Sequence, residues 1–326
     1  MQQYYDANGV PFRSMLIANF TKSAKLASIA PGIYNFMVSN NSISAVIKKL
    51  SGFAIKRSLP TVHSITLKSW HAKHVRNSTP KYKKKVYLFC DEFTNYNDTT
   101  IGIKAITLLE ALGYEVLIPK HIESGRTWLS KGLIRKCKEI INKNIELLSD
   151  IISSDTPLIG IEPSAILTFR DEYIDLANDN NYAKAKQLAT NVFLIDEFIA
   201  DEIDKGNINQ EQFTIETKTI KLHGHCQQKA LSNISYTTKI LSFPINYTVA
   251  SIPSGCCGMA GSFGYEKEHY DLSMQIGELV LLPAVRTASD ETIIAAPGTS
   301  CRHQIKDGTG KKALHPVEIL WDALIK

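Results

Sequence analysis

The sequence predicts an α/β protein made of two similar parallel-sheet halves that follow a helical N-terminal arm. Apolar, strand-like runs alternate with amphipathic helical segments, which is typical of parallel sheets with right-handed crossovers. The alternation occurs twice in the same order along the 326 residues. Cys90 and Ala165 are 75 positions apart, and Cys226 and Cys301 are also 75 positions apart. This equal spacing indicates an internal duplication.

The pattern divides the chain into three parts, which are an arm (1–84), a first repeat (85–205) and a second repeat (206–326). Within the arm, residues 30–35 (APGIYN) predict a turn between two short helices, and residues 57–60 (RSLP) an extended strap. Lysines 81, 83, 84 and 85 form a basic run that could bind nucleic acid or anionic lipid. Such runs are usually solvated, and we predict no nucleic-acid partner.

In the first repeat the expected strands are residues 85–90, 114–118 and 158–161, and the expected helices 99–112 and 130–148. The first strand reads KVYLFC, an apolar and β-prone run suited to a buried position. Leu108, Leu109 and Leu112 share one face of the first helix. Gly113 then stops that helix at the usual C-terminal position.

In the second repeat the expected strands are residues 219–222, 247–252 and 292–296, and the expected helices 230–241, 267–282 and 317–325. Functional loops of parallel sheets gather at the carboxyl ends of the strands. Each of the three strands is followed by cysteine, at Cys226, at Cys256 and Cys257, and at Cys301. We therefore expect these four thiols to meet at one edge of the second sheet.

Composition is that of an ordinary soluble globular protein, with 44% hydrophobic and 21% charged residues and a net charge of +5. No apolar run is long enough to span a membrane, and the first residues do not resemble a secretory signal. We expect a cytoplasmic location. In that reducing compartment the six cysteines are not expected to form disulfides, and their clustering points to metal or redox chemistry.

Four converging cysteines with glycines around them suit an iron–sulfur cluster, because several thiolates and backbone amides must surround an inorganic core. Gly255, Gly258 and Gly261 would let the loop wrap closely around it. Adjacent cysteines such as Cys256 and Cys257 can both point at one polynuclear centre. Mononuclear zinc more often takes ligands from spaced Cys-x-x-Cys turns.

The remaining candidates are weaker. Cys137 lies alone in a helical segment and is assigned no function, whereas Cys90 occupies the position equivalent to Cys226. The first repeat lacks the other thiols, since Gly125 and Arg126 stand near the place of the paired cysteines and Ala165 replaces Cys301. It is expected to be a scaffold or a docking surface. His223 and His225 could be ligands or hydrogen-bond donors, on the opposite face from Cys226 if the strand extends that far. His315 is expected to be a packing residue.

Several strings resemble the cysteine-rich "CCG" domain family, and in particular the carboxy-terminal part of fused FAD-linked oxidase/iron–sulfur oxidoreductases of the D-lactate or D-2-hydroxyglutarate dehydrogenase type. The same domain occurs in the iron–sulfur component of glycolate oxidase and in heterodisulfide reductase. The strings are TNYN (94–97), EPS (162–164), HCQQKA (225–230), GCCGMAGSFGYE (255–266) and GTSCRHQI (298–305). The resemblance extends from about Val10 to the end of the chain.

This resemblance implies tandem domains with a [4Fe-4S] cluster on Cys226, Cys256, Cys257 and Cys301. The chain would relay electrons from a flavin to a quinone, cytochrome or similar acceptor. The full heterodisulfide-reductase pattern has Cys-x-x-Cys at its last motif, and here Gly298 stands in place of the first cysteine, which favours a four-thiolate centre over a five-thiolate one. The FAD domain of the fused enzymes is missing from this sequence, so FAD is expected on a partner or on an upstream domain. The chain alone is not expected to be catalytic.

Two alternatives remain open. The same cysteines could hold zinc in a binding module without redox chemistry, or the chain could be a structural partner subunit whose cluster site is vestigial. The sequence does not decide which hydroxy acid or electron acceptor is involved. Peripheral association with the inner face of a membrane also remains open.

Overall fold

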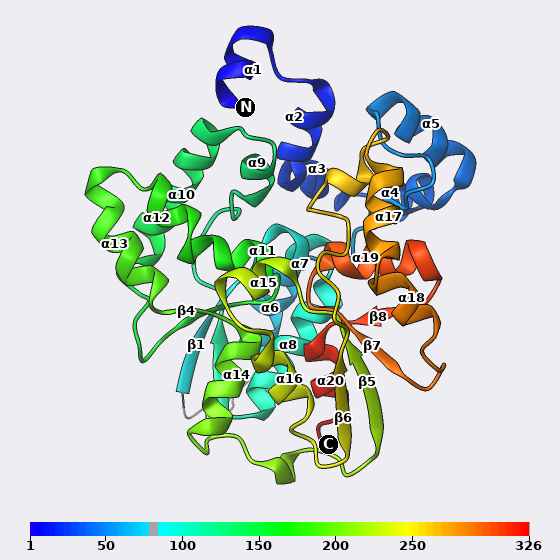
Figure 1. Cartoon of the computed structure of the whole chain (residues 1–326). Helices are drawn as coiled ribbons and strands as arrows, with labels where there is room; N and C mark the ends of the chain where they lie inside the picture. The colour runs from blue at the N-terminus through cyan, green and yellow to red at the C-terminus, as the bar shows by residue number, and fades with distance from the viewer. Residues whose placement is uncertain (78–83, 326) are drawn as a thin grey trace.

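Two parallel sheets of four strands organise the chain, as the computed structural model of residues 1–77 and 84–325 shows (Figure 1). The strand order is β2-β1-β3-β4 in the first sheet and β6-β5-β7-β8 in the second. The strands are β1 (Lys84–Phe89), β2 (Tyr114–Leu117), β3 (Leu158–Gly160), β4 (Val192–Leu194), β5 (Lys218–Leu222), β6 (Tyr247–Ser251), β7 (Ile293–Ala295) and β8 (Ala313–Leu314). The predicted α/β class with two parallel-sheet halves is confirmed.

Helices connect the strands within each half. The first half contains α7 (Glu92–Tyr96), α8 (Thr99–Ala111), α9 (Arg126–Ser130), α10 (Ile134–Leu148), α11 (Pro163–Ile166), α12 (Glu172–Leu176), α13 (Asp179–Ala189) and α14 (Ile195–Asp204). The second half contains α15 (Cys226–Leu231), α16 (Ile234–Leu241), α17 (Tyr270–Glu278), α18 (Leu281–Arg286), α19 (Thr299–Thr309) and α20 (Pro316–Asp322). Short 3₁₀ turns, η1 (Leu167–Arg170), η2 (Gln210–Gln212) and η3 (Phe263–Tyr265), complete the connections.

The six expected strands are present, with ends that differ by a residue or two. The helix expected at 130–148 is present as α10 but begins at Ile134, because Gly132 before it has a φ of +69° that a helix does not allow. Two other expected helices are broken. The segment 230–241 divides into α15 and α16, because the Asn233 side chain accepts from the Ser235 amide and starts a new helix. The segment 267–282 likewise divides into α17 and α18.

One hydrophobic core joins the two sheets. It contains side chains of both, such as Val86 of β1 and Ile220 of β5, together with Leu109 of α8 and Leu320 of α20. In Figure 1 the helices α8, α14, α16 and α20 lie between the two sheets. Smaller cores cover the outer face of each sheet. The domain limits predicted at residues 84 and 205 stay a prediction, since the central core draws on both sides of the second limit.

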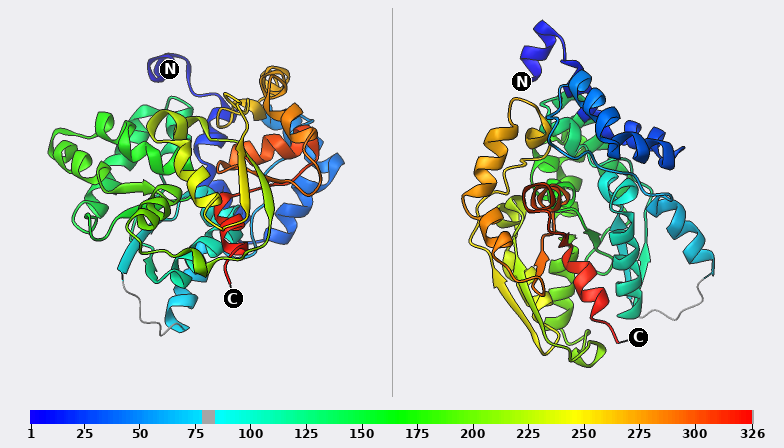
Figure 2. Two further views of the ribbon diagram at one scale, coloured as in Figure 1. Left: turned by 60° about the horizontal axis from the view of Figure 1, so that its bottom comes forward. Right: turned by 90° about the vertical axis from the view of Figure 1, so that its right-hand side faces the viewer.

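The described part of the arm forms six helices, α1 (Gln2–Asn8), α2 (Phe12–Ala18), α3 (Phe20–Ala27), α4 (Pro31–Ser39), α5 (Asn41–Ser51) and α6 (Leu67–Asn77). Figure 1 shows α1–α5 along the top of both halves, and the right-hand view of Figure 2 shows the arm along one edge of the molecule. The turn predicted at residues 30–35 lies earlier, at residues 28–30, because Pro31 already begins α4. Asn40 caps α5 by accepting from the Ser42 and Ile43 amides. Lys81 and Lys83 of the basic run lie outside the described residues.

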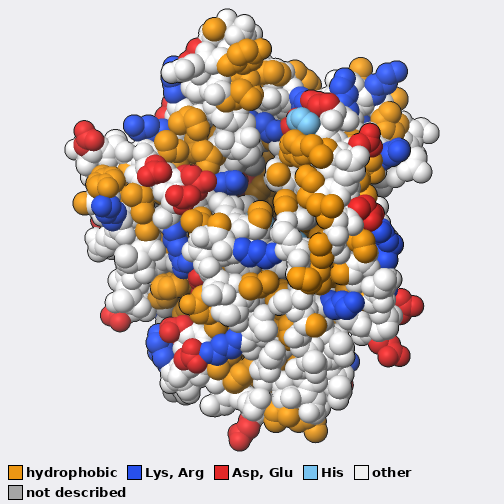
Figure 3. Space-filling model, in the orientation of Figure 1, with side chains coloured by type: hydrophobic (Ala, Val, Ile, Leu, Met, Phe, Trp, Pro, Cys, Tyr) orange, Lys and Arg blue, Asp and Glu red, His pale blue; other side chains and the backbone are white. Residues whose placement is uncertain are grey.

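The arm is tied to the second half by main-chain and side-chain bonds. The Ala54 amide donates to the Tyr265 carbonyl at 2.8 Å, and Phe53 forms an antiparallel bridge with Glu266. The predicted strap includes Arg57, whose side chain is fully buried. Figure 3 shows hydrophobic side chains along α17 and a hollow between α17 and the first half on the face it displays. The arm therefore braces the loops at the upper edge of the second sheet.

Candidate metal centre

The four candidate cysteines come together at the carboxyl edge of the second sheet. Cys226 opens α15 directly after β5, Cys256 and Cys257 lie in the loop after β6, and Cys301 lies in the first turn of α19 after β7. The sulfurs of Cys257 and Cys301 are 3.5 Å apart. The Cys256 thiol lies close enough to those of Cys226 and Cys257 for both to affect its pKa. Three loops thus bring the four thiols to one edge of the sheet.

The four thiols differ in how deeply they are buried. Cys257 and Cys301 are 5% and 2% exposed, Cys256 is half-buried and Cys226 is exposed. No cysteine of the chain is in a disulfide. A group held here would be covered by protein on the Cys301 side and accessible from the Cys226 side.

Hydrogen bonds between the thiols make two of them more acidic than ordinary cysteine. The Cys226 hydrogen bond lowers the pKa of Cys256, with help from Cys257 and from the Gly258 and Ala260 amides. The Cys257 hydrogen bond and nearby His223 lower the pKa of Cys301 well below its usual range. The pKa values of Cys226 and Cys257 are raised, first by their hydrogen bonds to Cys256. Cys256 and Cys301 are therefore the two thiols favoured as thiolates, which is the form that binds metal.

The glycines of the loop differ in what the backbone requires. Gly258 has a φ of +95°, and its amide lies 3.3 Å from the Cys256 sulfur. A Cβ at Gly258 would come within 2.1 Å of the Ser273 carbonyl oxygen, so no larger residue fits. Gly261 also has a positive φ, of +66°, whereas Gly255 is surrounded by open space. Gly258 therefore combines a tight turn with an amide aimed at a ligand sulfur.

His223 lies beside the buried pair of thiols. It is fully buried, its Nδ1 is 2.7 Å from the Ser254 hydroxyl, and its ring lies within 4.8 Å of the Cys257 and Cys301 sulfurs. Strand β5 ends at Leu222, so the alternation of faces considered for the two histidines does not apply. His225 instead caps α15, since its Nδ1 accepts from the Gln227 amide at 3.2 Å. His223 is thus the histidine placed for ligation or for hydrogen bonding to a sulfur.

The site has the donors that an iron–sulfur or zinc group requires. Four soft thiol ligands converge, a backbone amide points at one sulfur, and the His223 Nε2 has no conventional hydrogen-bond partner among the described residues. A buried nitrogen of this kind is normally satisfied. The residues therefore fit a metal group held by cysteine.

The equivalent edge of the first half contains no such set of thiols among the described residues. Cys90 is buried, its sulfur lies 3.5 Å from the Asn95 side-chain oxygen, and burial raises its pKa. Cys137 is buried in α10 with its sulfur 3.5 Å from the Gly125 carbonyl oxygen. Arg126 pairs with Glu172 at 2.8 Å, and Ala165 is fully buried. Buried carboxylates, at Asp91, Glu92 and Glu162, occupy this edge instead.

Sequence reasoning missed the residues that connect the two edges. The Glu162 carboxylate accepts from the Thr299 amide at 2.8 Å, at the start of the helix that carries Cys301. Asp98 pairs with Arg302 of the same helix at 2.6 Å. Arg57 donates to the Gly264 carbonyl at 3.0 Å and to the Gln304 side chain at 2.7 Å. The strings 162–164 and 298–305 contain the first of these pairs, but nothing in the sequence shows that they touch.

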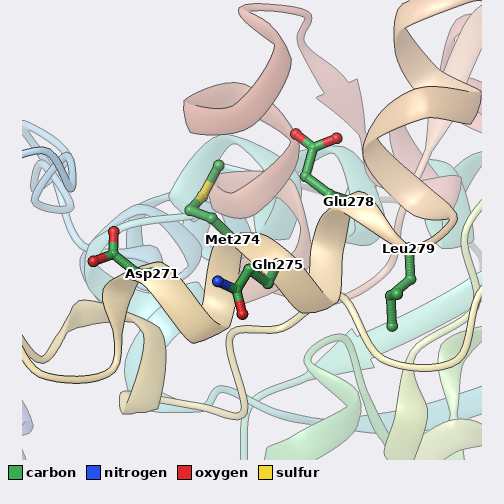
Figure 4. A pocket seen from close by; sticks show the side chains of 5 residues that line it. All are labelled: Asp271, Met274, Gln275, Glu278 and Leu279. Carbon is green, nitrogen blue, oxygen red and sulfur yellow. The ribbon is translucent and has the colours of Figure 1, made fainter.

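Two other features have weaker claims to be sites. Glu266, Glu268 and His269 lie close enough to hold a metal ion, but Arg13 pairs with both carboxylates and Lys131 with Glu266. A depression on α17 is lined by Asp271, Met274, Gln275, Glu278 and Leu279 (Figure 4). All five come from α17 and the residue after it, so this is an open helix surface.

Comparison with known proteins gives three kinds of relative, and no family model matches the chain. D-2-hydroxyglutarate dehydrogenase of Escherichia coli K12 is 24% identical over 336 residues, covering 99% of this chain and 32% of the relative. One of the subunits of anaerobic glycerol-3-phosphate dehydrogenase of the same organism is 24% identical over 326 residues, covering 98% of this chain and 79% of the relative. Lactate utilization protein A of Bacillus subtilis is 26% identical over 246 residues, covering 72% of this chain and 98% of the relative.

The chain therefore spans about a third of the D-2-hydroxyglutarate dehydrogenases it matches. These similarities agree with the oxidoreductase relatives expected from the sequence. No helix among the described residues has the length and apolar character needed to cross a membrane.

Proposed function

We propose that the chain is the iron–sulfur electron-transfer module of a flavin-dependent 2-hydroxy-acid dehydrogenase. The observation that carries the proposal is the convergence of four thiols at the carboxyl edge of β5, β6 and β7, where the Cys257 and Cys301 sulfurs are 3.5 Å apart. Dehydrogenases and one dehydrogenase component are similar to almost the whole chain, which supports the same role. The substrate of the complete dehydrogenase would be a 2-hydroxy acid similar to D-lactate or glycolate.

Cys226, Cys256, Cys257 and Cys301 would hold the cluster, as the cysteine-rich CCG family suggests. A bound cluster supplies one-electron transfer. The protein residues bind and shield it: the Gly258 amide donates to the Cys256 sulfur, and the burial of Cys257 and Cys301 excludes water from the inner side. Exposed Cys226 marks the side from which a redox partner would approach.

A four-thiolate [4Fe-4S] centre fits the residue at position 298. Gly298 precedes α19, and a Cβ there would come within 2.4 Å of the His225 ring. A cysteine in place of Gly298 would therefore require the cap of α15 to move. The four observed cysteines are enough for an ordinary cluster.

The partners in this proposal are a flavoprotein, which would carry FAD, and an electron acceptor such as a quinone or cytochrome. The arm offers a docking surface, because it carries exposed apolar side chains on successive helices. Those exposed by more than half are Met1, Tyr4, Phe12, Leu26, Ile29, Ile33, Phe36, Val46, Leu50 and Ile55. Apolar side chains gathered in this way are typical of interaction surfaces. A cytoplasmic location, with contact to the inner face of a membrane, is part of the proposal.

The test is anaerobic purification of the chain, followed by measurement of iron, acid-labile sulfide and zinc and by electron paramagnetic resonance after reduction. We expect brown protein with about four iron and four sulfide per chain. A colourless protein that binds no iron after anaerobic reconstitution would rule out the proposal.

Zinc is the second candidate, and the distance between two sulfurs favours it. Thiolates on one tetrahedral zinc ion, each about 2.3 Å from the metal, lie about 3.8 Å apart. The Cys257 and Cys301 sulfurs are 3.5 Å apart, which is close to that value. Near-stoichiometric zinc without sulfide, in protein that keeps its fold in air, would establish a non-redox binding module. A chain that binds neither metal yet supports its partner's activity would indicate a vestigial site.

A further inference from the structure

A polar cavity of about 400 Å³ lies where the arm meets both halves. Its wall includes residues from α4, α5 and the strap after them, Asn97 and Asp98 of the first half, and three residues of α19. None of the four cysteines lines it. A volume of this size suits a small molecule, and sites between structural units are common places for ligands.

Positive charge dominates the wall. Lys48, Lys56, Lys306 and Arg57 line the cavity, with Asp98 and Asp307 as the acidic residues. Both carboxylates already have cationic partners, since Arg57 lies 3.2 Å from Asp307 and Arg302 lies 2.6 Å from Asp98. The three lysines therefore leave the wall with an excess of positive charge, which favours an anion.

Two residues of the wall each have a buried polar atom without a hydrogen-bond partner among the described residues, namely the Ser44 hydroxyl and the Asn97 side-chain oxygen. Ser44 is only 2% exposed. The Asn97 amide nitrogen donates to the Thr61 carbonyl at 2.7 Å, which fixes the amide with its oxygen in need of a donor. Buried polar groups are normally paired, so two orphan atoms beside the same cavity indicate a polar ligand.

We propose that this cavity binds a small oxyanion that also carries a hydroxyl group, either a hydroxycarboxylate or a phosphate ester. Lys48 and Lys306 face the anionic group, the Ser44 hydroxyl donates to it, and the ligand hydroxyl donates to the Asn97 oxygen. The occupied cavity would join α5 to α19, because the ligand contacts residues of both helices. This site does not depend on whether the thiols hold iron, zinc or no metal.

The test is isothermal titration calorimetry on the full chain with two matched pairs of probes. Malate is compared with succinate, which lacks the hydroxyl, and β-glycerophosphate with methyl phosphate. We expect one hydroxylated probe to bind with a dissociation constant on the order of 1 mM or below, and its partner to bind about tenfold more weakly. The pair that shows this difference identifies the ligand as carboxylate or phosphate ester.

Three variants locate the binding. Lys306→Gln removes an exposed charge of the cavity, and Ser44→Ala removes a hydroxyl that makes no bond within the described protein. Each should weaken binding of the hydroxylated probe by about five- to tenfold. Lys312→Gln, at an exposed lysine outside the cavity, is the matched control and should leave it unchanged.

Circular dichroism without ligand shows whether each variant folds, so a loss of binding is separated from a loss of structure. The proposal is overturned if no probe binds at about 10 mM, if each probe binds as tightly as its hydroxyl-free partner, or if Lys312→Gln weakens binding as much as Lys306→Gln.

Discussion

The main-chain amide of Thr299 donates a hydrogen bond of 2.8 Å to the carboxylate of Glu162, which joins the second half of the molecule to the first. Glu162 lies after β3 and Thr299 opens α19, so the bond links corresponding edges of the two sheets. Glu162 is 3% exposed and also accepts from the Ser164 hydroxyl at 2.7 Å. The half without the thiol set thus anchors the helix that carries Cys301.

Replacing Glu162 by alanine should destabilise the protein by about 1–2 kcal/mol, because the partly buried Thr299 amide loses its acceptor. Glu162→Gln keeps an acceptor oxygen and should lose only about 1 kcal/mol. Chemical denaturation measures both values. Glu291→Ala, at an exposed carboxylate, is the control and should change stability by less than about 0.5 kcal/mol. Equal effects of Glu162→Ala and Glu291→Ala would contradict the anchoring role.

Serine in place of Cys256 or Cys301 should remove at least about half of the bound iron, because a cluster needs several thiolates. Cys137→Ala is the matched control, since Cys137 is buried far along the sequence from the four thiols and contacts the Gly125 carbonyl. Iron and sulfide analysis after anaerobic reconstitution gives the comparison. Full iron content in Cys256→Ser would show that this residue is no ligand.

Asp91 should make the protein less stable as the pH rises. Burial raises its pKa from an ordinary 3.8 to about 8, and neighbouring Glu92 adds to the shift. The folded state therefore keeps a proton that the unfolded state releases. The contribution of this proton to the free energy of unfolding is fully present below about pH 4 and is lost as the pH rises to about 8.

The Asp91→Asn variant should remove that part of the pH dependence. The asparagine oxygen can still accept from the Phe93 and Thr94 amides, which Asp91 caps at 2.9 Å. Urea denaturation between pH 5 and pH 8 is the measurement, with the exposed Asp150→Asn as control. Parallel curves for the wild type and Asp91→Asn would show that Asp91 is ionised in the folded protein.

Arg57→Ala should destabilise the protein by about 3–5 kcal/mol, because it leaves Asp307 and the Gly264 carbonyl without their buried partner. Gly264 belongs to the loop that carries Cys256 and Cys257, so faster proteolysis in that loop should accompany the loss. Arg57→Lys keeps the charge but not the fork of donors, and should recover only part of the stability. Arg76→Ala, at an exposed arginine, should have little effect. A similar loss of stability in both alanine variants would contradict the bracing role.

Periodicity predicted most of the elements but missed the strands β4 and β8. The strands that carry the candidate ligands could be found because they are apolar runs that end at proline, histidine or cysteine. β8 has two residues and β4 three, too few to establish an alternation, whereas β3 and β7 are as short as β4 but lie within longer apolar runs. The breaks at Gly132 and Asn233 depend on local capping and on a positive φ, which a helical pattern does not reveal.

The four cysteines could be predicted to meet because parallel topology brings the carboxyl ends of strands together. The roles of Arg57 and Glu162 could not, because each depends on a contact with a residue more than a hundred positions away. His223 lay between these cases. Its place next to Cys226 in the sequence was visible, but its approach to Cys257 and Cys301 requires the folded loops.

The central core that joins the two sheets limits how the gene could have changed after duplication. Leu109 of the first copy and Leu320 of the second are buried in the same core, so neither copy could be deleted without exposing the other's interior. At the edge of the first copy, Glu162 holds the start of α19, and only Cys90 stands where the second copy has a thiol. The two copies therefore fold as one unit, in which the copy without the thiol set supports the helix that carries Cys301.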